Sequence, residues 1–238
     1  MRKIIAMSSL ILCSLMSVAQ DQLIVDPNAQ LRTLTGSFNK IKVSHAIKVI
    51  ITQSDTESIA VSANDEKYMD DIVTELQGST LVIKSKGNSW TGRSNRQLKV
   101  YISFNKLEEV EVSGASDVIT VGAIKQPSLK IDVSGASVFK AEVEVKTVSL
   151  DMSGASKLVL MGMADVLKAD CSGASDLEAF GLTVEVANLD VSGASDIEIN
   201  VSKDIKAEAS GASSIRYKGT ASVTNVKTSG ASSIKKKE

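Results

Sequence analysis

One four-residue phrase, Ser-Gly-Ala-Ser, recurs along this chain and constrains its fold more than any other feature. The copies begin at Ser113, Ser134, Ser153, Ser172, Ser192, Ser210 and Ser229. The steps between successive copies are 21, 19, 19, 20, 18 and 19 residues. Seven copies at a near-constant step indicate a repeat architecture, in which each copy is one structural unit that stacks on its neighbours.

Apolar residues occupy fixed positions around each phrase. The residues three before and five after the first Ser are apolar in every copy, and the residue just before it is apolar in all copies except at Thr228. Polar residues lie between these columns, so apolar and polar positions alternate with the period of a β-strand. Each repeat is therefore predicted to hold one strand that ends at the phrase and another that starts after it. The rest of the repeat, such as residues 142–146, is predicted to form a short third side.

The length of the step favours one fold class among the repeat architectures. A propeller blade needs about 40 residues and a leucine-rich repeat about 20–29. A step near 19 suits one coil of a parallel β-solenoid, with Gly at the corner because it adopts backbone angles that other residues avoid. We therefore predict an all-β chain, a right-handed parallel β-helix-like solenoid with coils of about 19 residues and a more irregular N-terminal β part.

The chain divides into segments of different character. Residues 1–19 have the charged start, apolar stretch and small-residue end of a secretory signal peptide. Residues 20–37 are a loose lead-in, and residues 38–238 are predicted to form one domain. Its first part, 38–106, is irregular β, and its second part, 107–238, is the repeat solenoid. No later stretch has the 18 or more consecutive apolar residues of a membrane span.

The irregular part contains a degenerate copy of the phrase. Ser44-His45-Ala46-Ile47 has apolar residues at the positions that the columns require. His45, the only histidine, thus replaces the corner glycine, and we predict that it adopts a left-handed backbone there. Further on, Ser58 to Ala63 is predicted to be a strand and Asn64 a cap for a short helical turn. Two apolar runs around Gln77-Gly78-Ser79 are typical of a hairpin.

Few residues carry recognisable chemistry. We find no catalytic constellation, no cofactor motif and no metal site in the usual sense. Cys171, the one cysteine beyond the signal segment, falls in an apolar column and is expected to be a buried hydrophobe. Trp90, Arg93 and Arg96 lie in a polar, glycine-containing loop and form a candidate contact site.

An aspartate column is the second candidate. Four successive copies carry Asp two residues before the phrase, at Asp132, Asp151, Asp170 and Asp190. Stacked at the strand spacing, their carboxylates would repel one another. Solvent and salt screening would relieve this repulsion, and so would a hard cation such as Ca²⁺, which prefers oxygen ligands. Lysines such as Lys130 and Lys168 could neutralise the column instead. The column is therefore either a solvated polar face or a weak cation stripe.

Several segments together resemble a known family. They are Phe38 to Ser44, Val49 to Gln53, Gly78 to Ile83, and Leu107 leading into Val112-Ser113-Gly114-Ala115-Ser116. In this order they resemble the head GIN domain family, whose members are described as putative auto-transporter adhesins and are common among exported proteins of the Bacteroidetes type. The resemblance covers roughly residues 38 to 220. It implies an all-β, helix-like solenoid and export to the periplasm, the outer membrane surface or the medium.

Three classes of function fit this sequence. The first is a non-enzymatic binding or adhesion scaffold that presents repeated polar β-faces to a glycan or a surface protein. The second is a structural protein that assembles with copies of itself through the solenoid edges. The third is a carbohydrate-active β-helix enzyme, but the stacked aspartates share one environment, and nothing separates an acid from a base among them. The net charge of -1 and the lack of a basic stripe argue against a nucleic-acid partner.

Overall fold

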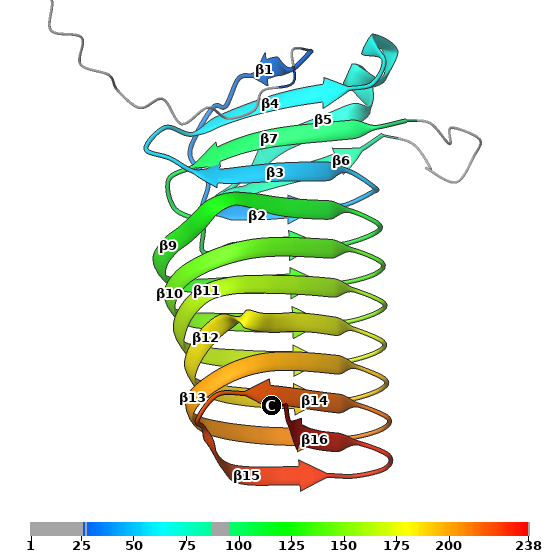
Figure 1. Ribbon diagram of the computed structural model, residues 1–238. Helices are drawn as coiled ribbons and strands as arrows, with labels where there is room; N and C mark the ends of the chain where they lie inside the picture. Colours follow the sequence, from blue (N-terminus) through cyan, green and yellow to red (C-terminus); the bar gives the residue numbers. More distant parts are fainter. Residues whose placement is uncertain (1–25, 27, 87–95, 238) are drawn as a thin grey trace, which may run out of the picture.

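The fold is a column of stacked coils, described by a computed structural model over residues 26, 28–86 and 96–237. Five long strands form the body of the column: β9 (Asp117–Val133), β10 (Val138–Met152), β11 (Lys157–Cys171), β12 (Asp176–Val191) and β13 (Asp196–Ala209). Each pairs in parallel with the next, so that one coil lies directly above another (Figure 1). The predicted parallel β-solenoid, with about seven turns of about 19 residues, is confirmed.

The two strands predicted for each coil are joined into one long bent strand. Along β10, buried and outward residues alternate from Val138 to Val145 and again from Val148 to Met152. Two successive residues, Lys146 and Thr147, break the alternation. We call this break the second bend, because the corner formed by the phrase is the first.

Differences in coil length are absorbed inside the strands, mostly between the phrase and the second bend. β10 and β11 pair from end to end without a register shift. β9 is longer than β10, and β12 is longer than β11 and β13, and each of these pairs has a register shift within the strand. The corners therefore stay aligned even where the step between phrases is 21, 20 or 18 residues.

The corner column explains the glycine of the phrase. Gly173 has φ +74°, a left-handed angle, and an added Cβ would lie 2.6 Å from the carbonyl oxygen of Gly154 in the coil before. The amide of the following residue, Ala174, donates to that same oxygen at 2.7 Å. Only a residue without a side chain allows both the backbone angle and this close hydrogen bond.

The core consists of the apolar columns on either side of the phrase. The residues one and three before it and five after it are buried in every coil from Val110 to Ile215. In the last copy Thr228 and Val226 are exposed, because β15 (Ser222–Thr228) pairs only with β13 among the described strands. The predicted inside and outside of the repeat are thus confirmed for the coils that have a neighbour on both sides.

A column of buried serines runs along the core, and the sequence interpretation did not predict it. The last Ser of each phrase is buried, as at Ser116, Ser137, Ser156, Ser175, Ser195 and Ser213. The hydroxyl of Ser195 lies 3.1 Å from that of Ser175 and donates to the carbonyl oxygen of Ser192 at 3.0 Å. The hydroxyls of Ser137 and Ser156 have no hydrogen-bond partner among the described residues.

This difference predicts opposite effects for one substitution at two places in the same column. Ser156→Ala should raise the free energy of unfolding by about 1 kcal/mol, because it removes a hydroxyl that is buried without a partner. Ser195→Ala should lower it by about 1–3 kcal/mol, because it removes two hydrogen bonds. Urea unfolding of both variants measures the difference. Equal losses would show that both hydroxyls are bonded.

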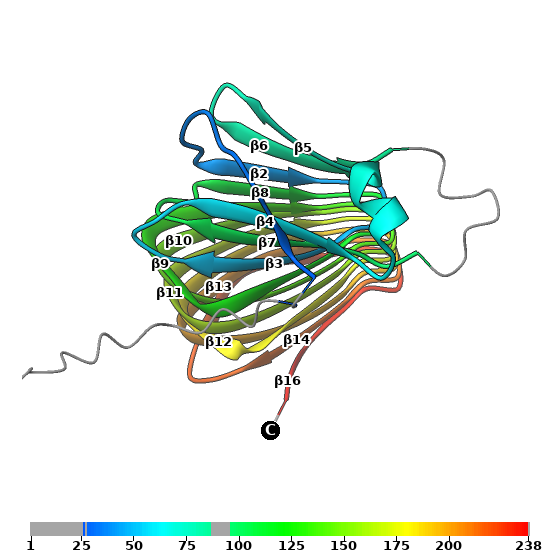
Figure 2. The same cartoon turned by 90° about the horizontal axis from the view of Figure 1, so that it is seen from above.

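The N-terminal part closes one end of the column with antiparallel pairs. β4 (Ser58–Ala63) lies between β1 (Gln30–Arg32) and β7 (Leu98–Phe104), antiparallel to both. β5 (Ile72–Gln77) is antiparallel to β6 (Thr80–Ser85), which confirms the hairpin. The remaining strands, β2 (Lys40–Val43), β3 (Lys48–Gln53) and β8 (Glu109–Val112), join this part in parallel to the first full coil. Seen along the axis, β4 and β7 lie across the end of the column, and β5 and β6 lie beside it (Figure 2).

Two details of this part can be compared with the sequence interpretation. His45 has φ +68°, so the predicted left-handed corner is confirmed. The helical turn, η1 (Glu66–Asp71), is capped by Asp65 rather than by Asn64, because the Asp65 carboxylate accepts from the amide of Lys67 at 3.2 Å.

At the C-terminal end of the column, β14 (Ser214–Lys218) pairs with β13 and with β16 (Ser233–Lys236).

Candidate functional site

Two rows of polar side chains run along one outer face of the column. The first row, which we call the acidic row, lies two residues before the first six phrases and consists of Glu111, Asp132, Asp151, Asp170, Asp190 and Glu208. The second, which we call the lysine–amide row, lies four residues before the last six phrases and consists of Lys130, Ser149, Lys168, Asn188, Lys206 and Asn225. Since the strands pair in register, each row repeats at the strand spacing of about 4.8 Å.

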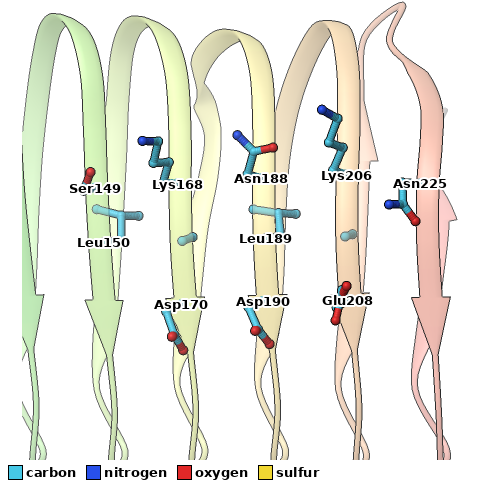
Figure 3. A pocket seen from close by; sticks show the side chains of 12 residues that line it. Ser149, Leu150, Lys168, Asp170, Asn188, Leu189, Asp190, Lys206, Glu208 and Asn225 are labelled. Atoms are coloured by element: carbon cyan, nitrogen blue, oxygen red, sulfur yellow. The ribbon is translucent and has the colours of Figure 1, made fainter.

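A hollow of about 570 Å³ lies between the two rows, and we call it the charged groove. Lys168 and Lys206 project on one side of it, and Asp170, Asp190 and Glu208 project on the other (Figure 3). The floor between the rows lies at Leu150, Ala169, Leu189 and Ala207, whose side chains point inward and are almost fully buried. The alternation of the strands causes this arrangement, because each floor residue sits between two outward residues of its own strand.

Lysines neutralise the two ends of the acidic row. Lys42 forms an ion pair with Glu111 at one end, and Lys227 forms one with Glu208 at the other. Both lysines belong to the same column as the acids, since Lys42 pairs in register with Glu111 and Lys227 with Glu208. The four aspartates between them make no ion pair within the described residues, so negative charge is concentrated in the middle of the row.

Burial and repulsion act on the aspartates. Partial burial raises the pKa of Asp132, and the charges of Asp151 and Glu111 raise it further. Burial, followed by the charges of Asp190 and Asp151, also raises the pKa of Asp170. Glu109, which lies beside the row, shows the opposite effect: hydrogen bonds from Lys130 and Lys40 lower its pKa.

The raised pKa values predict a stability that depends on pH. A carboxyl whose pKa is raised by folding contributes stability below its unfolded pKa and loses it as the pH rises through the folded value. Asp170→Asn should therefore raise the melting temperature at pH 7, and the gain should shrink as the pH falls through the raised pKa and as salt is added. The matched control is Asp165→Asn, an exposed aspartate of β11 outside the row, which should leave the melting curve unchanged. A melting temperature of Asp170→Asn equal to that of the native chain at pH 7 would contradict the argument.

A cation held by the aspartates stays a prediction. The structure brings Asp132, Asp151, Asp170 and Asp190 into one register. Within the described residues, however, no three His, Cys, Asp or Glu side chains are grouped so that they could hold a metal ion. Thermal melting with CaCl₂ against chelator at matched ionic strength is the test. A cation stripe predicts that calcium raises the melting temperature of the native chain and leaves Asp151→Asn/Asp170→Asn unchanged. Identical native curves would contradict the cation stripe and leave the aspartates as a solvated polar face.

The other candidate residues lie apart from the groove. Trp90 and Arg93 fall outside the described residues, so their role as a contact site stays a prediction. The side chain of Arg96 is 8% exposed, and its guanidinium pairs with Asp71 at 2.8 Å and contacts the hydroxyl of Ser85 at 3.5 Å. These contacts hold the Arg96 side chain against the last residue of η1 and the last residue of β6.

The two residues with reactive side chains are not placed for catalysis. Burial raises the pKa of the Cys171 thiol to about 12, so the thiol stays protonated. The Nδ1 atom of His45 lies 2.7 Å from the Ser44 hydroxyl, but both side chains are exposed and adjacent in the chain. This contact is local to the corner. Among the described residues, no carboxylate accepts a hydrogen bond from the His45 ring to orient it.

The sequence interpretation missed half of the charged groove. It identified the four aspartates but left out Glu111 and Glu208. It also did not recognise that Lys42 and Lys227 stand in the same column, one at each end. The signal was present, because all four lie two residues before a phrase or its degenerate copy. Lys168 was considered only as a charge that neutralises the aspartates, and Lys206 was not singled out, since their column alternates between lysine, amide and serine.

The fold and the charged groove define a class: an all-β solenoid that presents repeated polar rows on its outer surface. A model of the family described as "Putative auto-transporter adhesin, head GIN domain" matches residues 37–221. The chain belongs to this family.

Solved structures share the fold at low sequence identity. One is a putative adhesin from Bacteroides fragilis, with 21% identity, a TM-score of 0.80, and coverage of 89% of this chain and 98% of its own. A second, a putative adhesin from Parabacteroides distasonis, has 20% identity and a TM-score of 0.66 over 87% of this chain and 95% of its own. A third, named as a putative lipid binding protein from the same species, has 19% identity and a TM-score of 0.63 over 90% and 98%. No curated protein matches.

The family and these structures are named after adhesion or binding, not after an enzyme activity. In the part of the chain that the structure describes, no helix has both the length and the apolar character of a membrane span.

Proposed function

We propose that this chain is an exported, non-enzymatic binding scaffold of the adhesin type, and that the charged groove is its contact surface. One observation carries the proposal: the two rows lie in register on either side of a hollow that extends over five strands. The family description supports a role in adhesion. The signal-like character of residues 1–19 supports export.

The geometry of the rows fits a linear partner with repeated polar groups. Each row offers a hydrogen-bonding group at every coil, so a polymer laid along the axis meets the same chemistry at each step. Ammonium and amide groups on one side donate, and carboxylates on the other accept. A glycan, which carries hydroxyls on every ring and can both donate and accept, has this character. A surface protein is the alternative partner.

A glycan array with matched variants tests this function. Lys168→Gln/Lys206→Gln removes the charges of one side of the groove, and Asp170→Asn/Asp190→Asn removes those of the other. We expect the native protein to bind a subset of linear glycans, and each variant to weaken that binding about ten-fold or more, equivalent to about 1.4 kcal/mol. The control Lys140→Gln/Glu142→Gln changes two exposed residues of β10 outside the groove and should bind as the native chain does.

Two results would count against the proposal. Absence of any glycan binding would leave a surface protein as the partner to be sought. Glycan binding that is weakened equally by the groove variants and by the control would place the contact elsewhere on the column.

Assembly through the solenoid edge also stays a prediction. β15 and β16 each have one pairing partner among the described strands, and Val223 and Val226 are exposed on β15. Lys227 and the lysines of β16 add positive charge beside them, which disfavours the stacking of identical edges. Sedimentation at several protein concentrations tests assembly, because stacking makes the mass rise with concentration.

A further inference from the structure

Two methionines lie exposed on an outer surface of the column, away from the charged groove. Met161 and Met163 of β11 are 50% and 61% exposed. The other two methionines of the described chain, Met69 and Met152, are 5% and 0% exposed. The thioethers of one pair are thus open to solvent, and those of the other two residues are enclosed by the core.

The backbone between the two methionines keeps their side chains outside. Gly162 has φ +103°, and a Cβ at this position would overlap the carbonyl oxygen of Val143 in the coil before. On either side, Leu160 and Ala164 are buried and occupy the inward positions of the strand. Since side chains alternate along a strand, Met161 and Met163 both point outward.

The neighbouring coils make this pair unusual. In β10 the residues in register with Met161 and Met163 are Glu142 and Glu144. In β12 they are Gly181 and Thr183. Met161 lies against Gly181, where an added Cβ would come within 3.0 Å of the Met161 Cγ. These two positions hold methionine in β11, whereas the adjacent strands β10 and β12 have polar or small residues there.

Met163 also belongs to a hollow of about 780 Å³ at the second bend. Its apolar lining comes from four strands and includes Pro127, Val145, Met163, Ala164 and Val184. Charged residues such as Glu144, Lys146 and Glu185 surround it. Exposed apolar surface with a polar rim is typical of contact surfaces, and methionine is common in them because its side chain is flexible and polarisable.

We propose that Met161 and Met163 form a methionine oxidation site, at which a hydroperoxide converts this apolar surface into a polar one without unfolding the solenoid. A lone pair of the thioether sulfur attacks one peroxide oxygen, and the O–O bond breaks. Sulfur is oxidised to the sulfoxide and keeps that oxygen. The leaving oxygen takes the proton that the transferred oxygen carried and departs as water from hydrogen peroxide, or as an alcohol from an organic hydroperoxide. The thioether thus loses two electrons and hydrogen peroxide gains them.

The consequence follows from where the new oxygen lies. A sulfoxide is polar and would disrupt a core, as it would at Met152. At Met161 and Met163 the oxygen projects into solvent, so no buried contact is lost. The oxidised solenoid should keep its stability, while the hollow loses part of its apolar character.

Dilute hydrogen peroxide followed by peptide mass mapping tests the site. We expect one added oxygen on Met161 and one on Met163 while Met69 and Met152 stay reduced, and we expect an unchanged melting temperature. Treatment with the two methionine sulfoxide reductases should remove both oxygens from the folded protein. Oxidation of Met152 at the same rate as Met161, or a fall in melting temperature that parallels the oxidation, would overturn the proposal.

Binding of the apolar dye bis-ANS measures how apolar this surface is. The native protein should bind the dye several-fold more weakly after oxidation. The variant Met161→Leu/Met163→Leu keeps apolar side chains of similar volume, so it should bind the dye as the native protein does and be insensitive to peroxide. Equal dye binding by reduced and oxidised native protein would overturn the switch in polarity, and so would an equal loss in the leucine variant.

Discussion

Gly173→Ala should destabilise the protein by more than about 3 kcal/mol, although it adds a single methyl group. A left-handed backbone angle at alanine costs about 1–2 kcal/mol. The larger loss comes from stacking, because the new Cβ would lie 2.6 Å from the oxygen and 2.9 Å from the nitrogen of Gly154. The coils must then move apart, which weakens the hydrogen bond from Ala174 to Gly154. Urea unfolding measures the loss.

Gly122→Ala provides the matched control. Gly122 has φ +77°, almost the same angle, but an added Cβ there would find no atom within 4 Å. The free energy of unfolding of this control should therefore fall only by what the left-handed angle costs, about 1–2 kcal/mol. If the two variants lose equal stability, then the corner glycines are required by their backbone angle alone, and the close contact between coils contributes nothing.

Leu158→Asp should unfold the middle coils. Leu158 is fully buried, in register between Phe139 and Leu177 of the adjacent coils. An aspartate there would bury a charge with no partner, and the expected loss is about 3–5 kcal/mol or more. Circular dichroism during thermal melting would show a large fall in the melting temperature, or no folded baseline at all.

The same substitution one residue further on should be tolerated. Val159 points outward, in register between Lys140 and Glu178. Val159→Asp places a carboxylate beside a lysine and in solvent, so we expect a change of at most about 1 kcal/mol. Similar melting temperatures for Leu158→Asp and Val159→Asp would mean that the inward and outward columns are wrongly assigned.

The coil architecture could be predicted because every coil repeats the same signals. The spacing of Ser-Gly-Ala-Ser set the coil length, and the apolar columns set the inward positions. His45 was recognisable for the same reason, since it occupies the glycine position in a degenerate copy. Its φ of +68° shows that the first corner tolerates a side chain at this angle. The later corners all keep glycine: Gly114 stacks on His45, and each corner after it stacks on the glycine of the coil before.

Features that depend on contacts between coils were harder to predict. The last Ser of each phrase points inward, although serine is usually exposed, so its burial depends on the stacked corners around it. The register shifts that absorb longer coils depend on how two strands of unequal length pair. The charged groove required two columns to be considered together, and only the one made of identical aspartates was conspicuous.

The hydrogen bonds of the corner column have an electrical consequence. In the strands, successive peptide groups point in opposite directions, and their dipoles largely cancel. At the corners, the Gly–Ala peptide of each coil donates through Ala to the glycine carbonyl of the coil before, from Ala136 through to Ala231. These peptide dipoles are aligned head to tail, as they are in an α-helix.

The column should therefore carry partial positive charge at its His45 end and partial negative charge at its Gly230 end. Lys235, Lys236 and Lys237 follow the last corner, at the negative end, where a cation is stabilised. The two ends of the solenoid are thus electrically different. A charged group that stabilises one end would destabilise the other.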